Sequence, residues 1–431
     1  MTYSTRNVTE LQQTLAPAVY GGLDLGITPE RFRTALGENS ILRRKPRVQA
    51  LLDDAEQVEF FRQLTLMGDP LTDAFAARIP ELGYPKARAM VDQAAAHGID
   101  SVPDAPPELV ALLRAMEAVP AWVDWDAIER ASEHARLFSA LGGEALTRVA
   151  FMMTYVNGYQ GLPMVITGAL TSDSAAKRMK ETTSTFKLAT LPGALRRGGE
   201  AYQSAVKVRV MHAMVRTSLL RRPTVWDFGV YGTPIPQVDQ MGAALTINYR
   251  LAQRALARGR GFSTAERGVV EQGRYLASLL GMHDQFLSDD PQQIVETWQM
   301  CQATLRHKFD ERGRDLNRAT LEAYRRTSAQ WHDRVLHGMD QGATRFLYTQ
   351  LVGEKTAHDM GVQRELADAL AFASVFAPVG LGFGALTLAK RAPGVRRAVD
   401  RFATRTVKRQ LRVDGAAEYR TNEANYKTKA A

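Results

Sequence analysis

The stretch that most constrains the fold is residues 199–223, GEAYQSAVKVRVMHAMVRTSLLRRP. It starts at a glycine pair, ends at a proline and holds no helix breaker between them, so it predicts one helix. Arg209, His212 and Arg216 are spaced to project from one face of that helix. Two permanent cations beside an imidazole are costly to bury without an anionic partner. The stretch therefore predicts either a solvent-facing stripe, which helix geometry alone favours, or a buried site for an anionic ligand.

One ligand would satisfy all three side chains at once. A haem offers an iron for His212 and two propionates for Arg209 and Arg216. The preceding predicted helix places Arg178, Glu181 and Thr182 on one face. This second cluster is suited to line the distal side of a bound cofactor. The alternative is an intrahelical Arg–Glu pair in water, which contributes little stability.

The rest of the chain also predicts helices. No window alternates apolar and polar residues as a strand does, and no internal repeat is present, so the predicted class is all-α. The clearest linker is the proline-rich run 101–107. We expect a helical N-terminal extension over 1–105, a core over 106–350 and an apolar and basic segment over 351–431. Expected helices in the core include 108–118, 144–157, 238–257, 264–280, 291–309 and 316–348.

Two features stand out near the C-terminus. Residues 369–389 carry no charge over 21 residues, about enough to cross a bilayer. Pro378 and three glycines leave a buried helix–break–helix or a membrane-dipping segment as equal alternatives. Residues 390–412 are basic, so the pair predicts either peripheral contact with anionic lipid or a solvated final helix.

Composition narrows the partners and the compartment. The net charge is +9, but no zinc-finger, RNP-like or helix-turn-helix signature is present, so no nucleic-acid partner is expected. The only cysteine is Cys301, which excludes a disulfide framework and fits a reducing compartment. The first residues lack the apolar run of an export signal, so we expect a cytoplasmic protein, with membrane association as an open alternative.

Competing active sites find little support. The eight histidines include His332 and His337, whose offset of five does not suit a shared metal face on a helix. The sequence has no HExxH, no Walker loop and no Gly-x-Ser-x-Gly. Hydrolase, kinase and dehydrogenase functions therefore lose their main motifs.

Several pieces in order carry a family resemblance. They are 119–125 (VPAWVDW), Arg178 with Thr182, 208–216 (VRVMHAMVR), 231–239 (YGTPIPQVD) and 280–283 (LGMH). Together they resemble the family that contains latex-clearing protein (rubber oxygenase) and the fungal membrane oxygenase of mycophenolic acid synthesis. The resemblance covers roughly residues 106–348. It implies a globin-like helical core that holds haem b and uses dioxygen to cleave carbon–carbon double bonds of isoprenoids.

The resemblance also implies roles for single residues. His212 becomes the proximal iron ligand, Arg209 and Arg216 become propionate partners, and Arg178 and Thr182 become distal residues. Two positions depart from the family pattern. Glu181 stands where latex-clearing proteins have a lysine, and Leu162 lies near the place of a proposed acidic base.

Three functions follow as hypotheses. The first is a haem b oxygenase acting on an apolar isoprenoid, terpenoid or lipid smaller than rubber, with Glu181 as a general base. The second, suggested by the two departures, is a haem-binding sensor or carrier without turnover. The third is a helical protein at a membrane surface that holds no cofactor.

Overall fold

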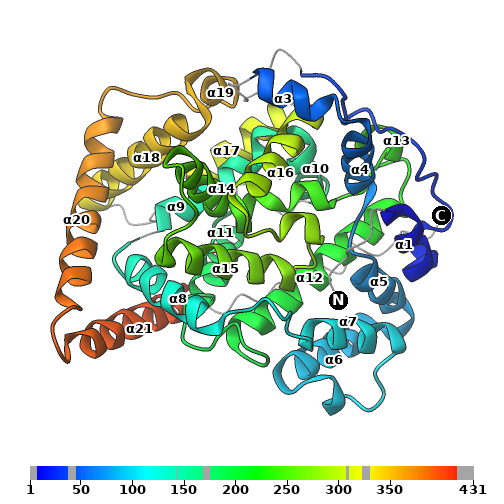
Figure 1. Ribbon diagram of the computed structural model, residues 1–431, viewed down its shortest axis with the longest axis horizontal. Helices are drawn as coiled ribbons and strands as arrows, with labels where there is room; N and C mark the ends of the chain where they lie inside the picture. The colour runs from blue at the N-terminus through cyan, green and yellow to red at the C-terminus, as the bar shows by residue number, and fades with distance from the viewer. Residues whose placement is uncertain are drawn as a thin grey trace. The chain divides into compact units, whose positions relative to one another are not determined.

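The computed structural model describes residues 7–36, 45–142, 144–167, 175–306, 310–322 and 331–414 (Figure 1). Within these residues the secondary structure is helical, and the only β-structure is an isolated bridge between Phe32 and Leu305. The all-α prediction is confirmed. The chain divides into two compact units, and each is described by itself below.

Unit 1 is drawn from Met1–Ala131 and Gly193–His307. It joins the N-terminal third of the chain to a segment that begins about sixty residues later. Its α-helices and 3-10 turns are α1 (Val8–Leu15), α2 (Pro17–Tyr20), α3 (Lys45–Leu52), α4 (Ala55–Leu66), α5 (Pro70–Leu82), α6 (Tyr84–His97), η1 (Ile99–Ser101), α7 (Pro107–Glu117), α12 (Glu200–Leu220), α13 (Phe228–Tyr231), η3 (Gln237–Asp239), α14 (Met241–Ala257), α15 (Thr264–Leu279), η4 (Asp284–Phe286) and α16 (Pro291–Thr304).

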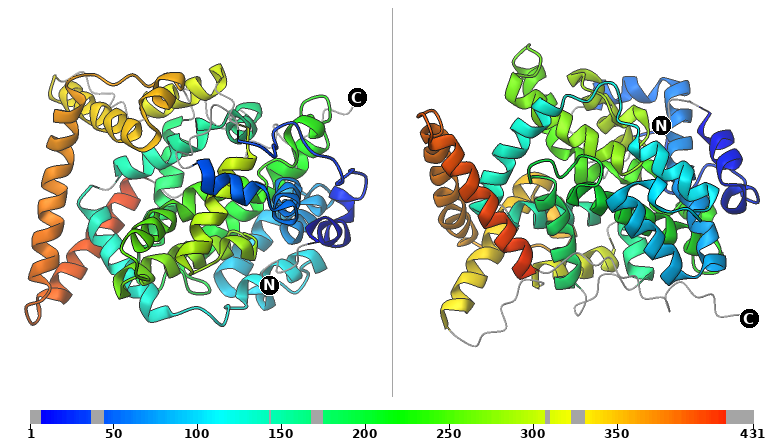
Figure 2. Two further views of the ribbon diagram at one scale, coloured as in Figure 1. Left: turned by 45° about the horizontal axis from the view of Figure 1, so that its top comes forward. Right: turned by 90° about the horizontal axis from the view of Figure 1, so that it is seen from below.

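Unit 2 is drawn from Ser132–Pro192 and Lys308–Glu418. It contains α9 (Glu144–Met153), η2 (Thr154–Val156), α10 (Gly158–Ile166), α11 (Ala175–Leu188), α17 (Glu311–Glu322), α18 (Trp331–Val352), α19 (Glu354–Asp359), α20 (Asp368–Ala389) and α21 (Val395–Asp414). Helix α8 (Trp125–Ala140) runs across the division between the units. Figure 2 shows α20 and α21 as two long helices joined by a short turn.

Local sequence signals set many helix ends. Pro70 is the first residue of α5, where its missing N–H costs no hydrogen bond. Ser263 and Glu266 form a reciprocal capping box at the start of α15. The central helix α12 begins after Gly199 and ends at Leu220, which is two residues short of Arg222, the last position before Pro223.

The helix expected over 316–348 is described in two parts, α17 up to Glu322 and α18 from Trp331, and residues 323–330 lie outside the described part. One helix prediction needs correction. The segment 369–389 is one continuous helix through Pro378, so the helix–break–helix alternative is wrong.

The domain boundaries expected from the sequence concern consecutive segments. The proline-rich run does separate helices, because α6 ends at His97 and α7 begins at Pro107. Both of these helices nevertheless belong to unit 1. The expected domain boundaries at residues 105 and 350 therefore differ from the boundaries of the compact units. The division into three consecutive domains stays a prediction.

Candidate functional site

Helix α12 forms the frame of the candidate proximal site in unit 1. It packs against α5, α6 and α15, and it is buried on nearly every side. Arg209 is 4% exposed and Arg216 is 1% exposed. The solvent-facing stripe that helix geometry favoured is therefore wrong. Both guanidinium groups lie inside the protein, where each needs an anionic partner.

The anionic partners come from the first turn of α5. Arg209 donates from Nε to Asp69 Oδ2 at 2.5 Å and from Nη2 to Oδ1 at 3.0 Å. Arg216 Nε lies 2.8 and 2.9 Å from the two carboxylate oxygens of Asp73. The two aspartates are four residues apart and so lie one above the other, facing the two arginines. Their position at a helix N-terminus further favours negative charge.

A second ring of donors completes the network around the ion pairs. The hydroxyl of Thr72 donates to Asp69 and that of Tyr20 donates to Asp73, both at 2.6 Å. Burial disfavours ionisation of both carboxyls, but Arg209 outweighs it at Asp69 and lowers the pKa of that group. At Asp73, burial and the charge of Asp69 outweigh Arg216 and raise the pKa to about 6.

Two glycines close the network where no side chain would fit. A Cβ at Gly68 would lie 2.5 Å from Nε of Arg216. A Cβ at Gly281 would lie 2.6 Å from both Arg209 Nε and Asp69 Oδ2, and Gly281 also has a φ of +79°. Each glycine thus lets backbone approach one ion pair closely.

The loop after α12 holds the same region together through its polar side chains. The buried amide of Gln237 donates to the carbonyls of Gly68 and Gly281 at 2.8 and 3.0 Å, and accepts from the backbone N–H of His283 at 2.9 Å. Arg216 Nη1 donates to the carbonyl of Ile235 at 2.8 Å. Ile235 has a φ of 50°, a strained conformation for a β-branched residue. This loop is therefore a scaffold that joins α4, α5 and α15.

The histidines of the two motifs at 208–216 and 280–283 have different surroundings. His212 is partly buried near the middle of α12, with Val208 one turn before it and Val215 one turn after it. His283 is buried, and its Nδ1 accepts from the backbone N–H of Gln285 at 3.1 Å. The ring of His283 also packs edge-to-face on Phe60. His283 is thus engaged as the cap of η4, a structural role.

The predicted distal residues lie on α11 in unit 2. Glu181 has a buried side chain, and Thr182 is partly buried. Arg178 belongs to the same helix, but its side chain lies outside the described residues. Within unit 2, α11 packs against α9, α17 and α21. The structure thus describes the proximal and distal predictions in separate units, each by itself.

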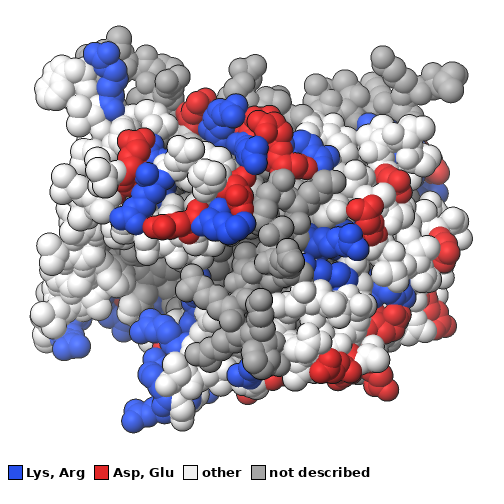
Figure 3. Space-filling view, turned by 90° about the horizontal axis from the view of Figure 1, so that it is seen from above, with Lys and Arg blue, Asp and Glu red and all other residues white. Residues whose placement is uncertain are grey.

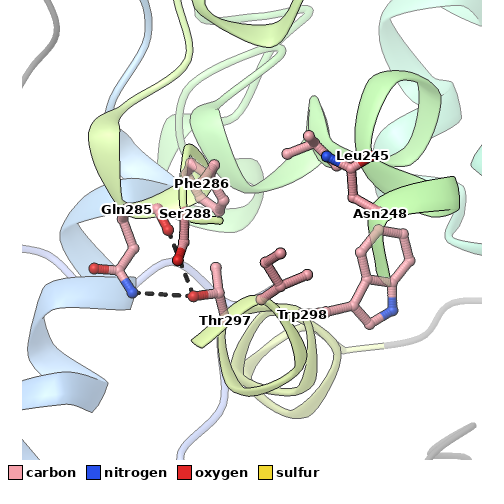
Figure 4. A pocket seen from close by; sticks show the side chains of 8 residues that line it. Leu245, Asn248, Gln285, Phe286, Ser288, Thr297 and Trp298 are labelled. Atoms are coloured by element: carbon pink, nitrogen blue, oxygen red, sulfur yellow. Dashed lines mark hydrogen bonds between the residues drawn. The ribbon is translucent and has the colours of Figure 1, made fainter. Parts of the chain in front are cut away.

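One small pocket in unit 1 is lined by none of the predicted site residues. It has a volume of about 20 Å³, room for roughly one water molecule. Gln285, Ser288 and Thr297 line one side of it and Trp298 another (Figure 4). A cavity of this size does not hold a porphyrin. Among the described residues, no group of three or more His, Cys, Asp and Glu side chains is arranged to hold a metal ion.

Comparison with known proteins identifies the family. Residues 143–381, more than half of the chain, match the family model described as "ER-bound oxygenase mpaB/B'/Rubber oxygenase, catalytic domain". The chain belongs to this oxygenase family. The matched range contains Arg178, Glu181, Thr182, Arg209, His212 and Arg216, whereas the 119–125 piece lies before it.

A solved structure shows the family's fold. Latex clearing protein LCP in its closed state matches with a TM-score of 0.56 at 18% identity, over 80% of this chain and 91% of that one. At this identity the match shows a shared fold and says nothing further about chemistry. No curated protein sequence matches the chain.

Sequence reasoning missed the partners of its own arginines. Asp69, Asp73 and Tyr20 were not singled out, although the cost of burying two cations required an anion nearby. The available signal was a pair of aspartates four residues apart at a proline-marked helix start. Nothing local linked that pair to a helix 140 residues away.

Proposed function

We propose that this protein is a haem b-dependent oxygenase acting on an apolar isoprenoid, terpenoid or lipid, in which His212 would bind the iron. One observation carries the proposal. The oxygenase family match spans α12, where two buried ion pairs fix the rotation of the helix that presents His212. An imidazole on a helix that is held in place suits a residue that would bind the iron.

The surroundings of His212 fit such a ligand. Val208 and Val215 lie one turn before and one turn after His212, so the imidazole has apolar neighbours on its own helical face. The predicted propionate contacts of Arg209 and Arg216 fit less simply. Each arginine already holds an aspartate, so a propionate would have to share that guanidinium. In our proposal the main task of both arginines is to set the register of α12.

Residues of the predicted distal side would accept a proton and orient the substrate and dioxygen. When bound, haem supplies the redox chemistry for reaction with dioxygen. We assign Glu181 as the base that would accept an allylic proton of the substrate, because its carboxylate is buried on the same helix as the other predicted distal residues. Thr182 and Arg178 would orient the substrate and dioxygen on the distal side. Oxidative cleavage of a carbon–carbon double bond is the expected outcome.

Absorption spectroscopy of the purified protein, expressed with ample haem, tests the ligand. The wild type should show a Soret band, and His212→Ala should abolish it. His283→Ala and the exposed His97→Ala should keep it, with thermal melting used to confirm that each variant is folded. Absence of the band from the wild type, or its loss in His283→Ala and retention in His212→Ala, would overturn the assignment.

A haem carrier or sensor is the alternative, because Glu181 replaces the family's lysine. Glu181→Gln separates the two functions. The variant should keep the Soret band and lose most oxygen-dependent formation of aldehyde or ketone products from isoprenoid substrates. If the wild type forms no such products while binding haem, the carrier function is correct. The cytoplasmic location remains a prediction.

A further inference from the structure

Helix α20 presents an apolar face to solvent. Its 22 residues include no charged side chain after Asp368. Leu370, Leu381 and Leu388 are 71%, 75% and 60% exposed. Alanine and glycine residues fill the same face between them. Contiguous exposed apolar surface of this kind marks a site of interaction.

The opposite face of α20 packs against other helices of unit 2. The ring of Phe372 packs at a tilt against Phe346 of α18, and Phe383 packs edge-to-face on Phe138 of α8. The described residues include one helix long and apolar enough to cross a membrane, and it is α20. One side of it is therefore already covered by protein.

Both ends of α20 are tied to unit 2 by ion pairs. At its start, Asp368 accepts from Arg345 of α18 at 2.6 and 3.0 Å. Just past its end, Lys390 lies 3.0 Å from Glu133 of α8, and Arg396 of α21 lies 2.7 Å from the same carboxylate. A helix of this length that crossed a bilayer would place its two ends, about 33 Å apart, on opposite sides of the membrane. The ion pairs instead attach both ends of α20 to the same compact unit.

The next helix adds positive charge beside the apolar face. Residues 390–412 contain nine Lys or Arg and one Asp, a net charge of +8. Helix α21 buries Val399, Ala403 and Val407 and exposes most of its basic side chains. The ion pairs described for this segment engage Lys390, Arg396 and Asp400. On the face drawn in Figure 3, basic and acidic side chains are interspersed over the upper part, whereas basic side chains predominate at the lower left.

We propose that α20 lies in the plane of an anionic phospholipid surface, with its exposed leucines inserted and the arginines of α21 on the headgroups. Apolar insertion beside clustered cations is the combination that binds anionic lipid. A second copy of the chain fits poorly. In a symmetric dimer the same patch meets itself, which would bring the two basic helices together. The inference does not depend on haem binding.

Sedimentation of the full-length protein with vesicles tests the proposal. The wild type should pellet with vesicles containing 30% phosphatidylserine and pellet far less with pure phosphatidylcholine. Leu370→Asp/Leu381→Asp/Leu388→Asp should weaken binding at least 10-fold. Arg401→Glu/Arg405→Glu/Arg409→Glu should weaken it about 100-fold or more, given roughly 1 kcal/mol for each basic residue at the surface.

Matched variants on unit 1 control for general surface effects. Ile247→Asp alters an exposed apolar residue of α14, and Arg250→Glu/Arg254→Glu/Arg260→Glu makes the same change in net charge. Both should bind anionic vesicles as the wild type does. The proposal would be overturned if the control variants and the α21 variant lost vesicle binding equally. It would also be overturned if the triple leucine variant bound vesicles as the wild type does. A dimer in light scattering that the leucine variant dissociates would overturn it too.

Labelling decides between lying in the membrane and spanning it. Leu366→Cys and Arg391→Cys place thiols at exposed sites beside the two ends of α20, while the native Cys301 is buried. A membrane-impermeant maleimide added outside sealed vesicles should label both sites. Protection of one end only would show that α20 crosses the bilayer and would overturn the in-plane arrangement. The Soret band should be unchanged in every α20 and α21 variant.

Discussion

Helices α12 and α20 are nearly equal in length, yet each reverses the usual arrangement of side chains in a different way. Helix α12 holds Arg209 and Arg216 inside unit 1. Helix α20 holds Leu370, Leu381 and Leu388 outside unit 2. The reversal in α12 is compensated within the chain, because Asp69 and Asp73 neutralise both cations. The reversal in α20 has no such compensation in the described chain, which is why it points to an external partner.

This contrast also separates stability from function. Changes at the α12 network should unfold unit 1, since a buried charge without its partner is strongly destabilising. Changes on the exposed face of α20 should leave folding intact, because the altered side chains are already in water. The predictions below test that division, starting from the largest effect.

Arg216→Met should cause the largest loss of stability. It leaves Asp73 buried without its cation, and breaking a buried pair from one side costs about 3–5 kcal/mol. Adding Asp73→Leu to the same chain should restore part of the loss, since no buried charge then remains. Urea unfolding followed by circular dichroism measures both. Arg397→Met on the exposed side of α21 is the control and should stay within about 0.5 kcal/mol.

The pH dependence of stability should report Asp73. Its pKa is about 6 in the folded protein, above the value of about 3.9 for an unfolded chain. The folded state therefore binds this proton more tightly. Its contribution is complete below about pH 4 and is lost as pH rises through about 6, a change of about 3 kcal/mol. Unfolding free energies from pH 4 to 7 should fall more steeply for the wild type than for Asp73→Asn.

Gly281→Ala should destabilise by about 1–3 kcal/mol. The new methyl group would meet Arg209 and Asp69, and the positive φ disfavours any Cβ. Gly338→Ala gives a control of opposite sign. Gly338 lies exposed inside α18 with open space around it, so alanine should stabilise by about 0.5–1 kcal/mol. Thermal melting of both variants would show whether the close contacts at Gly281 determine the sign of the stability change.

Glu133→Gln should have the smallest effect. The Arg396 and Lys390 side chains lower the pKa of Glu133 to about 2, so its stabilising contribution is present above about pH 4.5 and falls as the pH drops towards 2. Because Arg396 is exposed, solvent screens its pair with Glu133, and the amide oxygen of the variant can still accept from Lys390, so the loss should stay at about 1 kcal/mol. Hydrogen exchange should nevertheless rise in α21. Unchanged exchange there would mean that apolar packing alone holds this helix.

The sequence by itself determined the helical class, the spacing of Arg209, His212 and Arg216, and the uncharged run that became α20. Helix periodicity fixes these features, because it sets which neighbours share a face without reference to the rest of the chain. The ordered motifs also gave the family, which the family match confirmed. The roles of His212 and Glu181 stay predictions that spectroscopy and turnover can test.

Only the tertiary structure decided which faces are buried. The motif arginines and Gln237 proved to be polar core groups, because segments far apart in sequence meet around α12. Pro378 did not break α20, and its neighbours Phe376 and Val379 continue the same helix. A periodic pattern gives one face of a helix, but the partner on that face depends on long-range contacts. That is why the aspartates of α5 and the solvent side of α20 emerged only from the fold.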